Sequence, residues 1–340
     1  MDRFLALTLA ARTRAFEQAG IERGLSPTSV AKDFWVCLAL RQLFALPEFG
    51  PHLTFKGGTS LSKAWGLIDR FSEDVDLTID HAVLGIDAGK EPETANSGKE
   101  RNRRIDAIKT ACRETVEKRI ASALTASLAA AIGSRGWSLT IDPNNSDQQT
   151  LLFTYPEPPA PDTGRYVRPV VKLEFGARGE PWPAAERVVL PIVAEVFPDL
   201  FDSAATTVRA LRPERTFWEK MMLLHEERQR PGDRPPKDGM SRHYYDVYRL
   251  IENGVAARAV ADDALLAQVA AHRKAYFRYG HIDYAAMRRG SIQMLPTPAQ
   301  LDHWRRDYEA MQREMFVVPP PDFTTVLSTI ERFQAEFNAA

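Results

Sequence analysis

The chain has 340 residues, 44% of them apolar and 26% charged, which fits one large or two ordinary domains with a sizeable core. The net charge of −1 excludes a globally basic nucleic-acid-binding protein, so any such surface has to be a local patch. Without an 18-residue apolar stretch or a signal-peptide-like start, the expectation is a cytoplasmic protein with no membrane span. Cys37 and Cys112 are expected to be core residues, not a disulfide or a zinc site.

Two helices are predicted in the first 50 residues. The first covers about 3–19, and the second begins with Ser26 as its cap and Pro27 at its first helical position. The wide apolar stripe of the second helix suits packing. Lys32 and Asp33, in the same helix, are expected at the surface.

A glycine turn follows. A short apolar strand ending at residue 55 is broken by Gly57 and Gly58, and Thr59 or Ser60 is predicted to cap the next helix. Backbone N–H groups at such a turn suit the phosphates of a nucleotide. These four residues are therefore predicted to bind a nucleotide.

Residues 74–79 alternate polar and apolar, as in a strand. Asp74 and Asp76 then share a face, and two adjacent carboxylates repel unless a cation lies between them. A solvated sheet edge shows the same alternation. The preceding glycine turn favours a site for Mg²⁺, or Mn²⁺ in its place, with phosphate oxygens as further ligands. A glycine pair followed by Asp-x-Asp resembles the signature of the DNA-polymerase-β-like nucleotidyltransferase superfamily.

The next segment, about 99–131, is predicted to be helical. Its part from 99 to 119 has eight Lys or Arg residues against four Asp or Glu residues. A basic helix face of this kind is either a solvated surface or a contact for RNA.

Strands are then predicted at 137–141, 150–155, 168–175 and 187–196. In the third of them Lys172 and Glu174 share a face. Glu174 is the candidate for the third carboxylate of a two-metal phosphoryl-transfer centre, and the alternative is an ion pair with Lys172.

From residue 213 the chain is predicted to be helical, with Ser241 capping one helix. Lys220 and Asp246 lie in otherwise apolar helical contexts, where a buried charge is expensive unless it is paired or functional. Residues 272–289 are basic and aromatic, which suits RNA contacts or a packed helix with a solvated basic side.

Four motifs occur in order: Lys-Gly-Gly-Thr-Ser-Leu, Arg-Phe-Ser-Glu-Asp-Val-Asp-Leu, Thr-Phe-Trp-Glu-Lys and His-Tyr-Tyr-Asp-Val-Tyr-Arg-Leu. Together, over about 30–250, they resemble the AbiEii/AbiGii family of nucleotidyltransferase toxins from abortive-infection toxin–antitoxin systems, which includes the mycobacterial Men-type toxins. The resemblance implies an enzyme that uses an NTP and Mg²⁺ to add nucleotides to RNA, some members acting on the tRNA 3′ acceptor end. It also implies a cognate antitoxin.

The resemblance further implies roles for single residues. Ser72 would join the two aspartates in the metal and triphosphate motif, Lys220 would bind the phosphates, and Asp246 would be a late essential acid. Lys172 and Glu174 fit the family's central-strand motif less closely, and there Lys172 would be a further nucleotide-binding residue. His243 departs from relatives that have Arg-Asp before the tyrosine segment, which leaves its role open.

These patterns predict an α+β protein with a polymerase-β-like mixed sheet flanked by helices and a helical C-terminal region. The expected domains are 1–205, the nucleotidyltransferase, and 206–340, a helical domain that contributes Lys220 and Asp246. Asp246 either orients Lys220 or acts as a base, and Arg70 serves the triphosphate or an ion pair. The alternatives are transfer to a protein hydroxyl or a small molecule, and a non-catalytic nucleotide-binding module. The preferred NTP, the acceptor and the oligomeric state stay open.

Overall fold

The structure is a computed structural model that describes residues 1–70, 74–87, 89–156, 170–232, 236–277, 279–316 and 319–339. The chain divides into two compact units. The first comprises Met1–Trp65, Phe71–Lys90 and Asn102–Leu211, and the second Gly66–Arg70, Glu91–Arg101 and Arg212–Ala340. Within the described ranges, no helix combines the length and the apolar character needed to span a bilayer.

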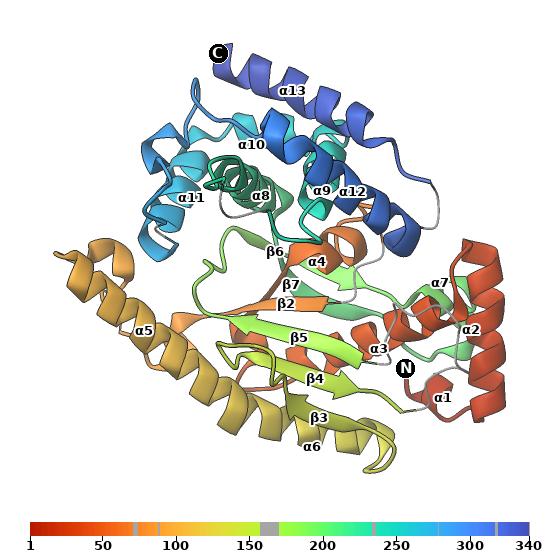
Figure 1. Ribbon diagram of the computed structural model, residues 1–340. Coiled ribbons are helices and arrows are strands. Elements are labelled where there is room, and N and C mark those ends of the chain that lie inside the picture. Colours follow the sequence, from red (N-terminus) through yellow and green to blue (C-terminus); the bar gives the residue numbers. More distant parts are fainter. Residues whose placement is uncertain are drawn as a thin grey trace. The chain divides into compact units, whose positions relative to one another are not determined.

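The first unit is built on a seven-stranded sheet with the order β3-β4-β5-β2-β1-β7-β6 (Figure 1). The strands are β1 Leu53–Lys56, β2 Asp74–Ile79, β3 Ser138–Ile141, β4 Thr150–Thr154, β5 Val170–Gly176, β6 Ala184–Val189 and β7 Thr206–Leu211. The pairs β1–β7 and β2–β5 are parallel and the other four are antiparallel, so the sheet is mixed.

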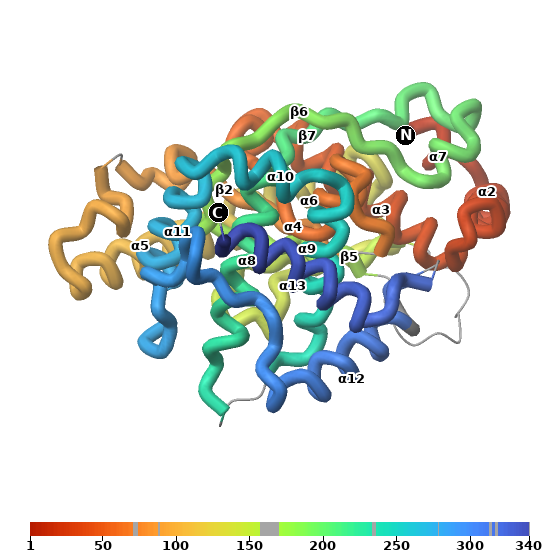
Figure 2. The backbone as a smooth tube through the Cα atoms, turned by 90° about the horizontal axis from the view of Figure 1, so that it is seen from above, coloured from red at the N-terminus to blue at the C-terminus, as the bar shows by residue number. Residues whose placement is uncertain are grey.

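Helices of the first unit are α1 Asp2–Leu5, α2 Leu9–Arg23, α3 Pro27–Phe44, α4 Gly57–Lys63, α6 Ala121–Ile132 and α7 Ile192–Val196. Helix α5 (Gly98–Glu114) continues through a π-helical segment, Thr115–Ile120, into α6. Helix α3 packs against β5 and β7, α4 packs against β1 and β2, and α2 lies beside α7 (Figure 2). The predicted cap of α3 is confirmed, because the Ser26 hydroxyl accepts the N–H of Ser29 at 3.0 Å.

The expectation for Lys32 and Asp33 is wrong, because both are buried. Asp33 forms an ion pair with Lys63 at 2.8 Å and accepts the backbone N–H of Ile192, the first residue of α7, at 2.6 Å. A carboxylate at a helix start satisfies an otherwise unpaired donor. These charges therefore hold α3, α4 and α7 together. Cys37, on the same helix, is buried with a free thiol, as expected.

Two strands differ from the prediction. The expected strand 187–196 is β6 only as far as Val189, and Pro191 then begins α7. Strand β7 was not predicted, although it lies between β1 and β6. Its alternate residues Thr206, Val208 and Ala210 are buried, but six residues give little periodicity to detect.

The helices of the second unit are α8 Pro213–Arg228, α9 Arg242–Glu252, α10 Val255–Val260, α11 Asp263–Tyr276, α12 Pro298–Met315 and α13 Phe323–Ala339. Helix α8 contacts α9, α10 and α11, and α9 also packs against α13. Ser241 stands before α9 without a side-chain cap, and its N–H donates to Asp307 at 2.8 Å. The α+β class, with a mixed sheet, flanking helices and a helical C-terminal region, is confirmed.

Candidate active site

The glycine turn between β1 and α4 is shaped around one carboxylate. The prediction that Thr59 or Ser60 caps this helix is wrong, because α4 already begins at Gly57. Gly57 has φ +74°, which favours glycine, and a Cβ placed on it would lie 1.9 Å from Oδ2 of Asp76. Both the positive φ and the lack of room for a Cβ atom therefore require glycine here. The turn lies directly against the Asp76 carboxylate.

The rest of the turn is buried and tied to the neighbouring strand. Gly58, Thr59 and Ser60 are all buried. The Thr59 hydroxyl donates a hydrogen bond to the backbone carbonyl of Asp74, which fixes the start of α4 to the start of β2. Ser72, the remaining polar residue of this motif, lies outside the described residues.

Strands β2 and β5 bring the predicted acidic residues onto one face of the sheet. In the parallel register Asp74 lies opposite Lys172 and Asp76 lies opposite Glu174. Residues paired in this way point to the same face, and so do residues two apart in a strand. These four side chains, here called the acidic strand face, are half-buried, whereas the intervening apolar residues are buried.

Lys172 is bound within this face. Its ammonium lies 3.0 Å from a Glu174 carboxylate oxygen and 3.9 Å from Oδ2 of Asp142, a buried residue directly after β3. Partial burial acts to lower the pKa of Lys172, but the hydrogen bond that its ammonium donates to Glu174 and the charges of Glu174, Asp74 and Asp142 raise it overall. The predicted alternative of a Lys172–Glu174 ion pair is therefore present. Asp142 was not among the predicted site residues. The only sequence feature that could have indicated it is its position directly after a predicted strand.

The donor set of the acidic strand face suits a hard cation. Asp74, Asp76 and Glu174 offer the carboxylate oxygens that Mg²⁺ prefers. Among the described side chains, no three His, Cys, Asp or Glu groups converge closely enough to hold a metal ion by themselves. A cation here would thus bind to adjacent carboxylates and complete its shell with water or substrate oxygens, as Mg²⁺ commonly does.

The second unit contains a buried charge cluster of Arg70, Lys220 and Asp246. Arg70 donates to both carboxylate oxygens of Asp246, at 2.7 and 2.8 Å, and the Lys220 ammonium lies 2.9 Å from Oδ2. Asp246 is fully buried, and burial alone would raise its pKa, but the two cations lower that pKa well below its usual range. Arg70 thus makes the ion pair that was one of its two predicted roles.

His243 completes the surroundings of Lys220. Its Nδ1 lies 3.3 Å from the Lys220 ammonium, which has only donors, so the imidazole nitrogen accepts. Burial, followed by the positive charges of Lys220 and Arg242, lowers the pKa of His243 well below its usual value, against an opposing effect of Asp246. A neutral imidazole is therefore the form that fits this position.

His243 is expected to make the protein less stable in acid. Below about pH 6.5 the histidine binds a proton in the unfolded state but not in the folded state. The free energy of unfolding is therefore highest above that pH and decreases as the pH falls below it. Replacing His243 with glutamine, whose carbonyl can still accept from Lys220, should reduce the slope of unfolding free energy with pH by up to ~1.4 kcal/mol per unit. Urea unfolding between pH 7.5 and 5.5 measures this. Burial also lowers the pKa of His225, so a residual slope should remain, and equal slopes in both proteins would contradict the prediction.

Gly57→Ala is expected to impair the site more than the fold. The added methyl group must push the Asp76 carboxylate aside, and a displacement of about 1 Å can cost ~100-fold in rate. Gly85→Ala is the matched control, because Gly85 also has a positive φ, +70°, but no atom within 4 Å of an added Cβ. Both variants should lose ~1 kcal/mol of stability, and only Gly57→Ala should lose nucleotide transfer. Equal transfer rates would contradict the predicted role of Asp76.

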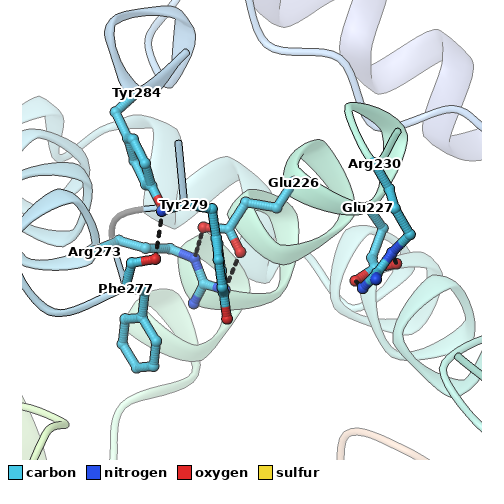
Figure 3. Close-up of polar contacts among 7 residues, drawn as sticks. All are labelled: Glu226, Glu227, Arg230, Arg273, Phe277, Tyr279 and Tyr284. Atoms are coloured by element: carbon cyan, nitrogen blue, oxygen red, sulfur yellow. Dashed lines mark hydrogen bonds and ion pairs between the residues drawn. The ribbon is translucent and has the colours of Figure 1, made fainter. Parts of the chain in front are cut away.

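The basic and aromatic stretch 272–289 is largely used for internal packing. Arg273 donates to both carboxylate oxygens of Glu226, at 2.6 and 2.5 Å, and the Tyr284 hydroxyl donates to the Phe277 carbonyl (Figure 3). Arg289 pairs with Asp263 at 2.9 Å. The exposed basic and aromatic residues among the described part of this stretch are Lys274, Tyr279, His281 and Arg288, whereas Arg278 lies outside the described part.

The basic run 99–119 lies on α5 and the π-helical segment. Some of its cations are paired, for example Lys109 with Asp147 at 3.4 Å and Arg119 with Glu48. Others, including Lys99 and Arg103, are exposed. The run therefore contains both paired and exposed cations, and the RNA contact stays a prediction for the exposed ones.

Comparison with known proteins gives a family. A family model described as "Nucleotidyl transferase AbiEii toxin, Type IV TA system" matches residues 38–333. Among solved structures, the chain is similar to the nucleotidyltransferase toxin MenT4 of Mycobacterium tuberculosis, with 18% sequence identity, a TM-score of 0.41 and 98% of each chain covered. No curated protein matches. Since the family model spans most of the sequence, the chain belongs to the AbiEii nucleotidyltransferase toxin family of type IV toxin–antitoxin systems.

Proposed function

We propose that the protein is a metal-dependent toxin that transfers a nucleotide from an NTP to RNA, with the tRNA 3′ acceptor end as the favoured substrate. The observation that carries the proposal is the acidic strand face, where Asp76 lies against Gly57 and is paired in register with Glu174. Membership of a nucleotidyltransferase toxin family supports the reaction class and implies an NTP substrate and an antitoxin partner. The reaction is attack of an RNA 3′-hydroxyl on the α-phosphorus, with pyrophosphate as the leaving group.

In the first unit, Asp74 and Asp76 are proposed to hold Mg²⁺, with Glu174 as the third carboxylate beside them. Mg²⁺, or Mn²⁺ in its place, would supply positive charge to the triphosphate and lower the pKa of the attacking hydroxyl. The backbone of the glycine turn at Gly57 to Ser60 is proposed to face the phosphates. Such catalysis consists mainly of positioning and charge stabilisation.

In the second unit, Lys220 is proposed to bind the NTP phosphates. Two cations and one carboxylate leave the buried charge cluster with an excess positive charge, and the neutral His243 does not offset it. Lys220 is its least buried member, with 9% of its side chain exposed, so it is the cation that an anion can reach. Asp246, whose pKa is lowered and whose oxygens are bound by two cations, is a poor base and is proposed to position Lys220.

The acceptor and the partner follow from the same chemistry. The exposed cations of 99–119 and the exposed Tyr279 and His281 are proposed to contact a polyanionic RNA, by charge and by stacking. Because NTP and tRNA are found in the cytoplasm, we place the reaction there. The cognate antitoxin is proposed to suppress it.

Incubation of the protein with each α-³²P-labelled NTP and total tRNA tests this function. Label in tRNA that depends on Mg²⁺ supports the proposal, and a single effective NTP would name the donor. Label in protein, or in an added small hydroxyl compound, would instead assign a different acceptor to the same reaction class. No transfer from any NTP would leave a nucleotide-binding module without catalysis and would overturn the proposal.

A further inference from the structure

Lys172 is the feature of the acidic strand face that the proposed reaction does not use. It lies opposite Asp74 in the register and makes its close contact, 3.0 Å, with Glu174. Glu174 is the residue that a two-metal centre would need as the carboxylate for a second ion. The ammonium of Lys172 thus already neutralises the carboxylate on which a second divalent ion would depend.

The position of Lys172 is fixed from a second side. Asp142, which is buried at the end of β3, places Oδ2 3.9 Å from the Lys172 ammonium. The other carboxylate oxygen of Asp142 accepts the N–H of Asn144 at 2.9 Å, which holds the carboxylate in place. The Lys172 ammonium therefore lies between the carboxylates of Asp142 and Glu174. These two contacts hold the side chain beside β2.

Carboxylates outnumber ammonium groups in this region. The register and contacts place four carboxylates here, Asp74, Asp76, Asp142 and Glu174, and one ammonium group, that of Lys172. Lys56 lies opposite Asp76 on β1, and a Cβ on Gly179 would lie 3.0 Å from its Nζ and 3.1 Å from Oγ1 of Thr78.

We infer that the site binds one divalent ion, at Asp74 and Asp76, and that Lys172 takes the place of the second. This inference rests on the proposed function, because it assumes that the acidic strand face binds the metal of a nucleotidyltransferase. Lys172 is then a positioning and charge-balancing residue that keeps Glu174 out of metal coordination.

The stoichiometry of Mn²⁺ tests the inference. Binding is measured on the full chain by electron paramagnetic resonance of free Mn²⁺, with a non-hydrolysable NTP analogue present, and the Mn²⁺ bound by the same concentration of analogue without protein is subtracted. The wild type should bind one Mn²⁺ per chain. Lys172→Met should bind a second ion at least ~10-fold more tightly than the wild type does, because a positive charge beside the carboxylates is gone. Lys172→Arg keeps the charge and should bind one.

Lys109→Met is the matched control, because Lys109 is also a half-exposed lysine paired with a carboxylate, Asp147, in the same unit. It should bind one Mn²⁺. Thermal melting checks that each variant folds, and Lys172→Gln is the substitute if the methionine variant does not. Two ions in the wild type, or no change on replacing Lys172, would overturn the inference while leaving the proposed function intact. No Mn²⁺ binding by the wild type would overturn both, and transfer of label to tRNA with one ion bound would support both.

Discussion

Asp246→Asn is expected to lower the free energy of unfolding by ~3–5 kcal/mol at pH 7, the usual cost of removing one partner from a buried ion pair. The loss is large because the variant leaves Arg70 and Lys220 buried without their counter-charge. The stability that Asp246 contributes is fully present above the unfolded pKa of about 3.9 and is lost as the pH falls below it, because its folded pKa is lowered. Urea denaturation at pH 7 measures the effect.

Asp263→Asn is the matched control. Asp263 also pairs with an arginine in the second unit, at 2.9 Å, but 77% of its side chain is exposed, so the loss should be below ~1 kcal/mol. A second comparison uses Lys220→Met. On its own it should destabilise the protein, but in the Asp246→Asn background it removes an uncompensated buried cation and should cost less or even stabilise. Strictly additive losses, or equal losses for Asp246→Asn and Asp263→Asn, would contradict a coupled buried cluster.

Local patterns in the sequence predicted which residues share a face, but not which strands are neighbours. The period of two in 74–79 and in 170–175 places Asp74 with Asp76 and Lys172 with Glu174 by strand geometry alone. The pairing of Asp76 with Glu174 depends on the parallel contact of β2 with β5, which are almost a hundred residues apart. Register of this kind is set by long-range packing, and a sequence stretch carries no local trace of it.

The missed features share this long-range origin. Strand β7 has a weak alternation of its own and is stabilised between β1 and β6. Lys32 and Asp33 are charged residues in an apolar helix, so the sequence alone favoured exposure, whereas Lys63 and the start of α7 provide partners for Asp33. Burial of a charge is decided by its partner, and the partner lies elsewhere in the chain.

Arg70 shows the same limit at the candidate site. Its place beside the Asp-x-Asp motif left two roles open, and only the contact with Asp246, 176 residues away, identifies the ion pair. The family motifs contain both residues, but a motif gives order along the chain and not distance in space. Lys220 and Asp246, by contrast, were predicted to be paired or functional from their apolar surroundings, and their 2.9 Å contact gives them a partner.

Asp74→Asn is expected to reduce nucleotide transfer by ~1000-fold or more while the fold is retained. The asparagine is nearly isosteric and keeps the backbone carbonyl that accepts the Thr59 hydroxyl, so α4 stays tied to β2. What is lost is one negative charge and one strong cation ligand from the acidic strand face. Removal of a single charge-stabilising group from an active site commonly costs 100- to 1000-fold, and a metal ligand should lie at or beyond the upper end. Transfer of ³²P label to tRNA at saturating Mg²⁺ measures the effect.

The control is Glu186→Gln, which removes a carboxylate from β6, an exposed strand of the same sheet. It should transfer label at the wild-type rate. Raising the Mn²⁺ concentration should recover part of the activity of Asp74→Asn, since the remaining Asp76 still offers a carboxylate and mass action favours occupancy of a weakened site. No such recovery is expected for Gly57→Ala, where the ligands are present but displaced. A fully active Asp74→Asn variant would remove the acidic strand face from the reaction.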